Sequence, residues 1–464
     1  MPKAQLQYLA DEVQKLRDQG LYQKLRILEG GQLPLARFDG REVINLSSNN
    51  YLGLTTHPRL KRRAAEALEK YGVGSGAVRT IAGTMSIHMQ LEEKIAAFKN
   101  VEASVVFQSG FTANAGAVAA LIGPEDVIIS DELNHASIID GCRLSKAEIR
   151  RFPHKDIDGC RKVLRELGSH KGRKLLITDG VFSMDGDIAP LPELVKLAEE
   201  YGCIMMIDDA HASGVLGRNG RGTVDHFNLH GRVDIQVGTL SKAIGALGGY
   251  VCSTRDAIEF LYHRARPFLF STSHPPSVAA TCLAAFELLD EEPQLVQQLW
   301  TNTRFFKEGL NQLGFNTGAS ETPITPIMAG DAALAHQFSR ELFEAGVFAQ
   351  GIGYPTVAKG KARLRTIVTA THTQEQLSRA LEALETVGKK LKDLCKCKVR
   401  SMDKDKPQTH HDTWGKLSRV FSSFLSILEG LKKCAASRKD AKVRRENLIH
   451  SLCDFAPLRE VFAF

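Results

Sequence analysis

Two segments, Ile204-Met-Met-Ile-Asp208-Asp209-Ala-His211 and Ile235-Gln-Val-Gly238-Thr239-Leu-Ser241-Lys242, indicate the fold class of this chain. Each is a short apolar run that ends in polar side chains, as expected for a buried strand of a helix-covered, mostly parallel sheet. Ligands of such sheets bind at the carboxyl ends of the strands. The acids after the first strand need a cation, because a buried charge without a partner is costly. Lys242, after the second strand, is the candidate for that cation.

Similar apolar runs alternate with amphipathic helices between residues 56 and 290. This alternation predicts an α/β architecture. We expect strands at 103–107, 126–130, 174–178, 204–207, 235–238 and 249–252, and helices at 59–70, 87–98, 191–200 and 255–261. Outside this region we expect a helix at 5–17, a short strand at 43–46, and a smaller second domain with a strand at 363–368 and a helix at 377–394.

Composition excludes several classes of protein. The chain has 464 residues, of which 43% are hydrophobic and 24% charged, close to average globular usage. No uncharged apolar run reaches the roughly 18 residues of a membrane span, and residues 1–20 lack the apolar core of a secretory signal. We therefore expect a cytoplasmic protein without a transmembrane segment.

The formal net charge of +7 is concentrated at the C-terminal end. Residues 397–464 hold 14 Lys and Arg against 8 Asp and Glu, and residues 395–464 hold four of the nine cysteines. The body is nearly neutral, which argues against nucleic-acid binding. Its cysteines occur singly, as expected of reduced thiols. We expect no metal site, because no cysteine pair has the spacing of zinc ligands.

The residues after the two strands have the chemistry of a pyridoxal-phosphate site. A lysine beside hydroxyls, as in Thr239-Leu-Ser241-Lys242, is typical of a Schiff-base lysine with phosphate-binding neighbours. Taken alone, each segment is equally compatible with an ordinary Asp–Lys ion pair. Together with Asp208 they offer an imine-forming amine, an acid for the pyridinium nitrogen and donors for the phosphate.

Two further segments support this interpretation. Ser109-Gly110-Phe111-Thr112 follows the 103–107 strand and opens a helix of small residues, whose N-terminal amides form an anion site. By itself this is a weak signal, since many α/β turns look like it. His135 follows the 126–130 strand, where it would lie on a planar cofactor, although a lone loop histidine is more often only solvated.

These motifs resemble the α-oxoamine synthases, which are pyridoxal-phosphate enzymes of fold type I that condense an amino acid with an acyl-CoA thioester. The resemblance covers residues 1–394. It rests, in the family's order, on Asn49-Asn50-Tyr51-Leu52-Gly53-Leu54, Gly74-Ser-Gly-Ala-Val-Arg79-Thr-Ile-Ala-Gly83-Thr84, Ser109-Gly110-Phe111, Asn134-His135-Ala136-Ser137, Asp179-Gly-Val-Phe-Ser183-Met-Asp185-Gly186, Asp208-Asp-Ala-His211, Thr239-Leu-Ser-Lys242, Phe268-Leu-Phe-Ser271-Thr272-Ser273 and Arg363-Leu-Arg365-Thr366.

The family resemblance implies an overall domain organisation. It implies a large pyridoxal-phosphate domain at 56–290, with a mostly parallel seven-stranded sheet covered by helices. A smaller α+β domain at 291–394 would be joined by the N-terminal segment 1–55. Residues 395–464 would be a basic tail of unknown role with one amphipathic helix.

The resemblance also implies roles for individual residues, with cofactor pyridoxal 5'-phosphate on Lys242 as a Schiff base. The catalytic residues would be Lys242, His135, Asp208 and His211. The cofactor would be bound by these four together with Gly110, Phe111, Ser183, Thr239, Ser241, Ser271 and Thr272, the last two reaching the phosphate of the neighbouring subunit in a homodimer. The substrate would be bound by His135, Asn50 and Arg365, whose planar guanidinium suits a carboxylate.

Within the family, the motifs look most like glycine C-acetyltransferase, which condenses glycine with acetyl-CoA to 2-amino-3-oxobutyrate. The alternative is 8-amino-7-oxononanoate synthase, which joins L-alanine to a pimeloyl thioester with loss of carbon dioxide. Thr272 departs from the Asn of some acetyltransferases and leaves the acyl preference open. A third hypothesis, of a different class, is a non-catalytic subunit of the same fold. The intact Lys242, Asp208, His135 and Arg365 weigh against it.

The tail has apolar residues at three- and four-residue steps between Trp414 and Leu431, which predict an amphipathic helix. Packing on the enzyme body, binding to a partner or membrane surface, and a non-native extension without a role are the open alternatives.

Overall fold

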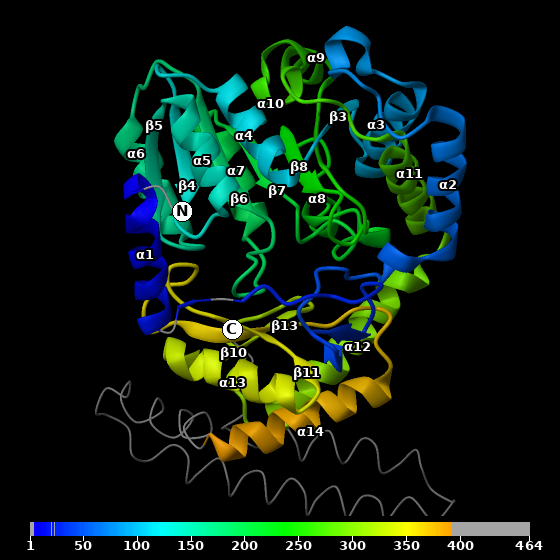
Figure 1. The fold of residues 1–464 in the computed structure, drawn as a ribbon. Helices are drawn as coiled ribbons and strands as arrows, with labels where there is room; N and C mark the ends of the chain where they lie inside the picture. Colours follow the sequence, from blue (N-terminus) through cyan, green and yellow to red (C-terminus); the bar gives the residue numbers. More distant parts are fainter. Residues whose placement is uncertain (1–3, 20, 23, 392–464) are drawn as a thin grey trace, which may run out of the picture. The chain divides into compact units, whose positions relative to one another are not determined.

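A seven-stranded sheet, in the order β3-β9-β8-β7-β6-β4-β5, organises most of the chain (Figure 1). The computed structural model describes residues 4–19, 21–22 and 24–391. The strands are β3 (Ala103–Phe107), β4 (Val127–Asp131), β5 (Glu148–Phe152), β6 (Lys174–Asp179), β7 (Ile204–Asp208), β8 (Ile235–Thr239) and β9 (Gly249–Ser253). β4, β5, β6, β7 and β8 pair in parallel, and β9 is antiparallel to both β8 and β3. The predicted mostly parallel seven-stranded sheet is confirmed.

Six of the seven strands agree with the prediction to within one residue at each end. They are apolar because helices cover both faces of the sheet, so strands such as β7 and β8 are almost wholly buried. The sequence analysis missed β5. Its first four residues, Glu148-Ile-Arg-Arg, are exposed at the sheet edge, where polar side chains are tolerated and the apolar signal is lost.

Some of the described helices begin at a residue whose side chain caps the first turn. α4 begins at Gly110 because the Ser109 hydroxyl accepts from the Thr112 amide, at 3.1 Å. The helices are α1 (Gln7–Asp18), α2 (Pro58–Tyr71), α3 (Ser86–Lys99), α4 (Gly110–Leu121), α5 (Ala136–Ser145), α6 (Ile157–Leu167), α7 (Leu191–Tyr201), α8 (Thr223–His226), α9 (Arg255–Arg264), α10 (Arg266–Leu269), α11 (Pro276–Glu291), α12 (Gln294–Gln312), α13 (Ala332–Glu344) and α14 (Gln374–Lys390). The helix predicted at 377–394 starts one turn earlier than expected, because Thr373 and Gln376 form a capping box.

Two three-stranded sheets lie below the large sheet in Figure 1. One has the order β1 (Leu35–Phe38), β2 (Arg41–Asn45), β11 (Val347–Phe348), so an N-terminal strand pairs with a strand 300 residues later. The other has the order β10 (Ile324–Gly330), β13 (Ala362–Ile367), β12 (Gln350–Ile352). The division of the body at residues 55 and 290 stays a prediction, and the tail lies outside the described residues.

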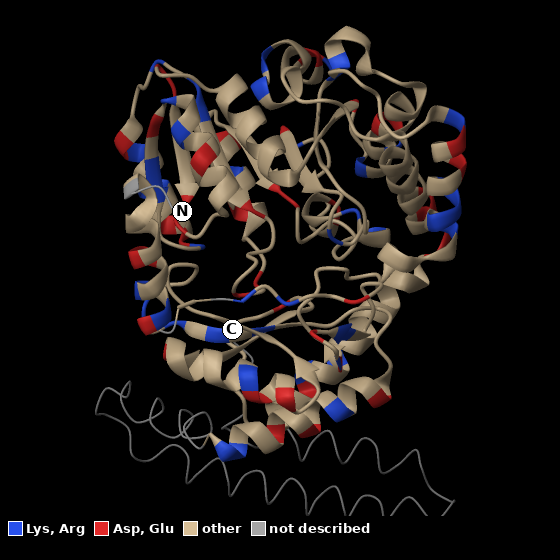
Figure 2. Cartoon of the chain, viewed as in Figure 1, with Lys and Arg blue, Asp and Glu red and all other residues tan. Residues whose placement is uncertain are grey.

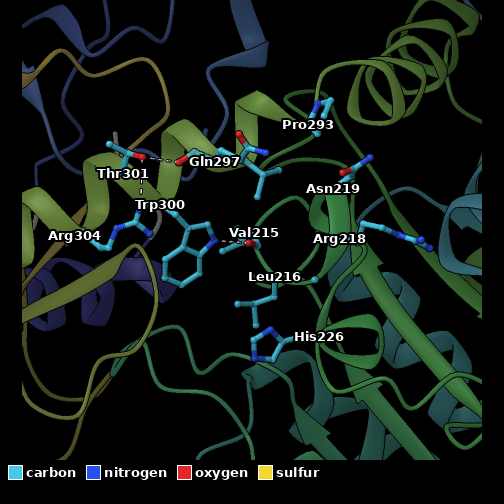
Figure 3. Close-up of a pocket in the computed structure, with 12 residues that line it drawn as sticks. Val215, Leu216, Arg218, Asn219, His226, Pro293, Gln297, Trp300, Thr301 and Arg304 are labelled. Carbon is cyan, nitrogen blue, oxygen red and sulfur yellow. Dashed lines mark hydrogen bonds between the residues drawn. The ribbon is translucent and has the colours of Figure 1, made fainter. Parts of the chain in front are cut away.

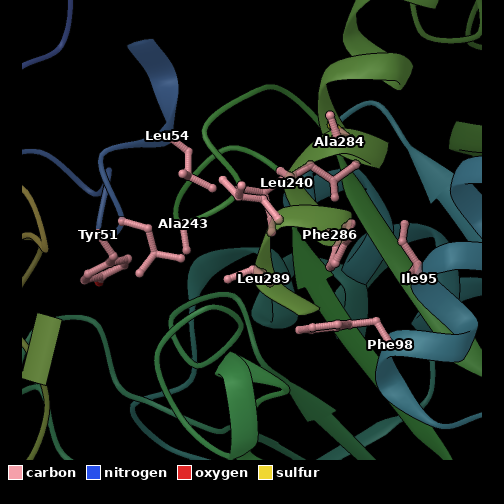
Figure 4. Close-up of a cluster of buried hydrophobic side chains, with 14 of the residues drawn as sticks. Tyr51, Leu54, Ile95, Phe98, Leu240, Ala243, Ala284, Phe286 and Leu289 are labelled. Atoms are coloured by element: carbon pink, nitrogen blue, oxygen red, sulfur yellow. The ribbon is translucent and has the colours of Figure 1, made fainter. Parts of the chain in front are cut away.

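A buried cluster fixes the loop that follows β8. Leu240 and Ala243, on either side of Lys242, are 0% and 1% exposed and pack with Leu54 and the side chains of α3 and α11 (Figure 4). Within this cluster the rings of Phe98 and Phe286 meet edge to face at 5.1 Å. The loop of Lys242 is therefore held by the hydrophobic core on both sides of the lysine.

Surface charge is mixed over the described residues. Figure 2 shows basic and acidic residues interspersed along α2 and α14. Cysteines 142, 160, 203, 252 and 282 are free. None of the described helices has the length and apolarity that a membrane span requires.

Candidate active site

The carboxyl ends of the parallel strands bring polar side chains to one edge of the large sheet. Asp179 ends β6 directly opposite Asp208, the last residue of β7, in the parallel register. Thr239 ends the neighbouring β8, and Lys242 follows it three residues later. These polar side chains lie together, as predicted, because their strands β6, β7 and β8 are neighbours in the sheet.

Lys242 has the electrostatic environment of a reactive amine. Burial lowers its pKa to about 8, with Asp208 and Asp179 opposing the shift and Arg365 adding to it. The unprotonated amine is the form that attacks a carbonyl carbon. A substantial fraction of Lys242 is therefore nucleophilic near neutral pH.

Asp208 is 3% exposed and is held by two nitrogen donors. The Asn114 side-chain amide donates to Oδ2 at 2.6 Å, and the Ala210 backbone amide donates to Oδ1 at 2.7 Å. These donors orient the Asp208 carboxylate, which is the group that would pair with a pyridinium nitrogen. The sequence analysis did not identify Asn114, although it is a lone amide in the small-residue run of α4.

The adjacent Asp209 is neutralised by a different residue. Lys99 Nζ lies 2.7 Å from Asp209 Oδ2, and both side chains are fully buried. Gly222 permits this packing, because a Cβ atom there would lie 2.0 Å from the same oxygen. Asp209 is therefore paired with a lysine. Asp208 faces the Lys242 site and has no lysine salt bridge among the described residues.

His135 caps helix α5 next to Asp179. Its backbone amide donates to Asp179 Oδ2 at 2.7 Å, and its ring Nδ1 lies 2.7 Å from the Ser137 hydroxyl. Burial and the nearby Asp208 raise the pKa of Asp179 well above its ordinary value. Burial lowers the pKa of His135, opposed by Asp208 and reinforced by Lys242.

His211 is a buried ring that is neutral at physiological pH. Burial, reinforced by Lys242 and Arg365, lowers its pKa well below the ordinary value. Its Nδ1 lies 2.7 Å from the hydroxyl of Tyr51. Tyr51, which is 0% exposed, thus orients His211, a role that the sequence analysis did not assign.

Arg365 lies on β13 and reaches back to the loop after β6. Its Nε donates to the Ser183 carbonyl at 2.6 Å, and Nη2 donates to Asn49 Oδ1 at 3.3 Å. The predicted substrate role of Asn50 stays a prediction. The Asn50 side chain donates instead to Thr55 Oγ1 and the Gln32 carbonyl, at 2.8 and 3.2 Å. The amide beside the guanidinium is Asn49, which adjoins Asn50 in the same motif and was not singled out from sequence.

The expected phosphate end lies at the N-terminus of α4. The Thr239 and Ser241 hydroxyls are 2.8 Å apart. A Cβ atom on Gly110 would come within 3.3 Å of Thr239 Cβ, so helix and strand approach closely here. Phe111 is 45% exposed at the same helix end. Free amides and two hydroxyls at a helix N-terminus match a phosphate dianion.

Ser271 and Thr272 follow α10. The Thr272 carbonyl accepts from Gln108 Nε2 at 2.5 Å, and Thr272 bridges to Val78. The segment therefore lies beside the end of β3 in its own chain. Its expected reach to a neighbouring subunit stays a prediction.

These residues fit pyridoxal phosphate. Four groups lie at one edge of the sheet: the Lys242 amine with its lowered pKa, the Asp208 carboxylate held by amides, the N-terminus of α4 and the Arg365 guanidinium. Each matches a different part of the cofactor or an amino-acid substrate. In the described ranges, no group of three or more His, Cys, Asp or Glu side chains has the arrangement of a metal site.

A cavity of about 750 Å³ lies elsewhere, between the segment after Ala212 and helix α12 (Figure 3). The Trp300 indole closes one side and donates to the Val215 carbonyl at 2.8 Å. None of the predicted site residues lines it. The volume of a cavity alone therefore does not identify the candidate active site.

The chain matches known proteins over most of its length. Residues 41–384 match the family model described as aminotransferase class I and II. An 8-amino-7-oxononanoate synthase from Symbiobacterium thermophilum is 62% identical over 83% of this chain and 98% of the relative. Relatives of the same name from Thermoanaerobacter pseudethanolicus and Bacillus subtilis are 60% and 54% identical, each over 83% of this chain and 98% of the relative.

Solved structures give the same family. A serine palmitoyltransferase from S. paucimobilis with a bound PLP–myriocin aldimine has a TM-score of 0.79 and 34% identity, over 84% of this chain and 98% of that one. An 8-amino-7-oxononanoate synthase from Francisella tularensis has a TM-score of 0.65 and 31% identity, over 75% of this chain and 98% of that one.

These relatives overturn the first functional prediction. Glycine C-acetyltransferase was expected from the motifs, but relatives at 54–62% identity are named 8-amino-7-oxononanoate synthase. The motifs misled because the two enzymes share the same cofactor chemistry. The fold type, the cofactor and the acyltransferase class are unaffected. The chain belongs to the aminotransferase class I and II family and, within it, to the pyridoxal-phosphate-dependent α-oxoamine synthases.

Proposed function

We propose that this chain is an 8-amino-7-oxononanoate synthase. It joins L-alanine to a pimeloyl thioester and releases the thiol carrier and carbon dioxide. The observation that carries the proposal is the 54–62% identity, across 98% of their length, with relatives of that name. The lysine, aspartate and arginine at the strand edge support it, because the reaction needs an amine, an acid and a carboxylate clamp.

The reaction balances without an oxidant. A carbon–carbon bond forms between the alanine α-carbon and the thioester carbonyl carbon, and the carbon–sulfur bond breaks. The α-carboxylate leaves as carbon dioxide, and a proton takes its place. Bound pyridoxal phosphate supplies an electron sink that acidifies the α-carbon.

Each residue at the strand edge has a task in this scheme. Lys242 would hold the cofactor and then move the α-proton, for which a pKa near 8 is suited because a general base works best near the operating pH. Asp208 would keep the pyridinium nitrogen protonated. Arg365 would bind the alanine carboxylate, with Asn49 and the Ser183 carbonyl fixing its guanidinium.

The remaining predicted residues would hold the cofactor. His135 would stack on its ring, Ser183 and His211 would contact the ring hydroxyl, and the α4 N-terminus with Thr239 and Ser241 would bind the phosphate. The homodimer, in which Ser271 and Thr272 serve the neighbouring site, and the cytoplasmic location are parts of this proposal. The free cysteines of the described residues support a reducing compartment.

A matrix of amino acids and acyl thioesters tests the proposal. Purified enzyme is incubated with alanine, glycine or serine against pimeloyl-, acetyl- or palmitoyl-CoA, and thiol release and carbon dioxide are both followed. We expect the highest kcat/KM for alanine with pimeloyl-CoA, with one carbon dioxide per thiol. Preference for another pair, or thiol release without carbon dioxide, would refute the assignment. Lys242→Ala provides the inactive control.

A further inference from the structure

Asp208, Asn114 and Ser137, which are buried, and the exposed His135 form a continuous hydrogen-bonded chain. Asn114 Nδ2 donates to Asp208 Oδ2 at 2.6 Å and to the Ser137 hydroxyl at 3.0 Å. The Ser137 hydroxyl lies 2.7 Å from His135 Nδ1, and the Ser137 backbone amide donates to the same nitrogen at 3.2 Å. Asn114 and Ser137 are 0% and 1% exposed, so water does not compete with these bonds.

The donors along this chain determine where protons lie. A backbone amide can only donate, so the His135 Nδ1 that faces it must be an acceptor and carry no proton. The Ser137 oxygen accepts from Asn114, which leaves the hydroxyl proton free to point to Nδ1. Both polar hydrogens near Nδ1 therefore come from Ser137.

The orientation of Asn114 follows from Asp208. If the amide were flipped, its oxygen would face the Asp208 carboxylate at hydrogen-bond distance, and two acceptors would repel each other. The acceptor oxygen of Asp208 therefore selects the orientation in which the NH₂ group points to both Asp208 and Ser137. The Asn114 oxygen has no hydrogen-bond partner in the part of the chain that the structure describes, so no competing bond favours the flipped orientation.

We propose that Ser137, oriented by Asn114, is a positioning residue that holds His135 in the neutral tautomer with its proton on Nε2. The ring then presents an N–H donor, and not a lone pair, on its open side. No described residue takes this nitrogen as a hydrogen-bond partner, and His135 is exposed at the strand edge.

The tautomer has a consequence that rests on the proposed function. An amino-acid substrate brings a carboxylate, which accepts hydrogen bonds and would be repelled by an unprotonated nitrogen. A fixed Nε2–H therefore adds a donor to the Arg365 guanidinium for binding alanine. The same hydrogen-bonded chain links this donor to Asp208, so one carboxylate orients both the cofactor nitrogen and the substrate donor.

Nitrogen NMR tests the tautomer without any turnover. Protein labelled with ¹⁵N-histidine is examined with and without pyridoxal phosphate, and the His135 signals are assigned by their absence in His135→Gln. We expect an unprotonated Nδ1 and a protonated Nε2 in both samples. A proton on Nδ1 would refute the proposal, whether or not the enzyme turns over alanine. A protein that shows the expected tautomer but does not use alanine would refute only the proposed function.

Ser137→Ala separates positioning from mere packing. We expect a second His135 tautomer to appear and the KM for alanine to rise about fivefold to tenfold, the value of one net hydrogen bond, with a smaller change in kcat. Ser137→Thr, which keeps the hydroxyl, should restore the single tautomer. Ser145→Ala is the matched control, since Ser145 is also buried on α5 and donates only to the Cys142 carbonyl. Unchanged His135 signals in Ser137→Ala would contradict the role of Ser137.

Discussion

Asp208 and Asp209 are identical neighbours in the sequence with different environments in the structure. Asp208 accepts from the Asn114 and Ala210 amides, which orient the carboxylate without cancelling its charge. Asp209 pairs with the ammonium of Lys99, at 2.7 Å, and also accepts from the Thr223 amide. Because alternate residues of a strand point to opposite faces, one acid serves the site and the other serves the core.

Replacing Lys99 by Met tests the structural role of the second acid. Lys99→Met leaves the Asp209 carboxylate buried without its cation, and we expect a loss of about 3–5 kcal/mol in the free energy of unfolding. Urea denaturation measures this. The control is Lys94→Met, which removes a half-exposed pair with Asp290 and should cost no more than about 1 kcal/mol. Equal losses in the two variants would contradict the assignment.

The lowered pKa of Lys242 predicts how cofactor binding depends on pH. Only the neutral amine reacts with the aldehyde, and a pKa of about 8 makes it the minor form at pH 7 and the major form at pH 9. The rate at which cofactor-free protein recovers its visible absorbance should therefore rise about tenfold between these pH values. A rate that does not change between pH 7 and 9 would contradict the shift. Lys242→Ala should show no such absorbance, whereas Lys94→Ala should behave as the wild type.

At the scale of elements, the loop between β6 and α7 is clamped by two different sheets. From β13, Arg363 donates to the Met184 carbonyl at 2.9 Å and pairs with Asp185. The Thr322 hydroxyl, just before β10, donates to the Gly186 carbonyl at 2.8 Å. From the large sheet, His154, the second residue after β5, contacts Asp187 Oδ2 through Nε2 at 3.0 Å. The loop whose Ser183 carbonyl accepts from Arg365 is therefore itself held by the small β10–β13–β12 sheet.

Arg363 tests this coupling, because it lies on the same face of β13 as Arg365. Arg363→Met removes the bonds to Met184 and Asp185 and leaves the Arg365 side chain in place. We expect the KM for the amino acid to rise about tenfold, with a smaller change in kcat, because the carboxylate clamp is displaced. Steady-state kinetics measure this. Arg161→Met, which breaks an exposed pair with Glu200, should leave both constants unchanged, and an equal effect of both variants would argue against the clamp.

His154 makes the stability of the same loop dependent on pH. Burial lowers its pKa, but hydrogen bonds to Asp131 and Asp187 outweigh this and raise the pKa to about 9, from an ordinary 6.5. A raised pKa means that the imidazolium stabilises the folded state fully below pH 6.5, and that this stabilisation is lost as the pH rises through 9.

The free energy of unfolding should thus fall by about 1–3 kcal/mol between pH 6 and pH 9.5 from this group. Urea titrations at both pH values measure the decrease. In His154→Gln the free energy of unfolding should fall less over this pH range, by the about 1–3 kcal/mol that His154 contributes in the wild type. A decrease of equal size in the variant and the wild type would show that other groups are responsible.

At the scale of the whole molecule, most of the net charge lies beyond the end of the family match. Most of the net charge lies in residues 397–464. The relatives align over 98% of their own length with about 384 residues of this chain, and the family match ends at residue 384. The residues proposed to be catalytic all precede this point.

Removal of residues 397–464 should therefore leave the kcat and KM values for alanine and pimeloyl-CoA unchanged. Kinetics of the truncated protein, together with its sedimentation, measure this. The full chain, purified in parallel, is the control. A loss of turnover or a change in oligomeric state on truncation would assign the tail a role in the enzyme.

The polar side chains at the carboxyl edge of the large sheet were predictable because the pattern that indicates them is local. Apolar strands such as β7 and β8 end directly in Asp208 and, after three residues, in Lys242, so their pattern predicts both sheet and site. The edge strand β5 was not predictable, because half of its surroundings is solvent and its side chains are charged. The choice of glycine C-acetyltransferase was wrong, since relatives at 54–62% identity are named 8-amino-7-oxononanoate synthase.

The sequence predicted the mostly parallel α/β sheet from its pattern and, together with the family resemblance, the cofactor, because buried strands and the polar residues at their ends are recognisable within a few residues. That Lys242 binds the cofactor stays a prediction. Only the folded chain decided which of two asparagines, Asn49 or Asn50, meets Arg365. It likewise decided which of two aspartates is neutralised by Lys99, and that Asn114 and Ser137 connect Asp208 to His135. These partners are far apart in sequence, and a hydrogen bond depends on positions within a few tenths of an ångström, which tertiary packing determines and local pattern does not.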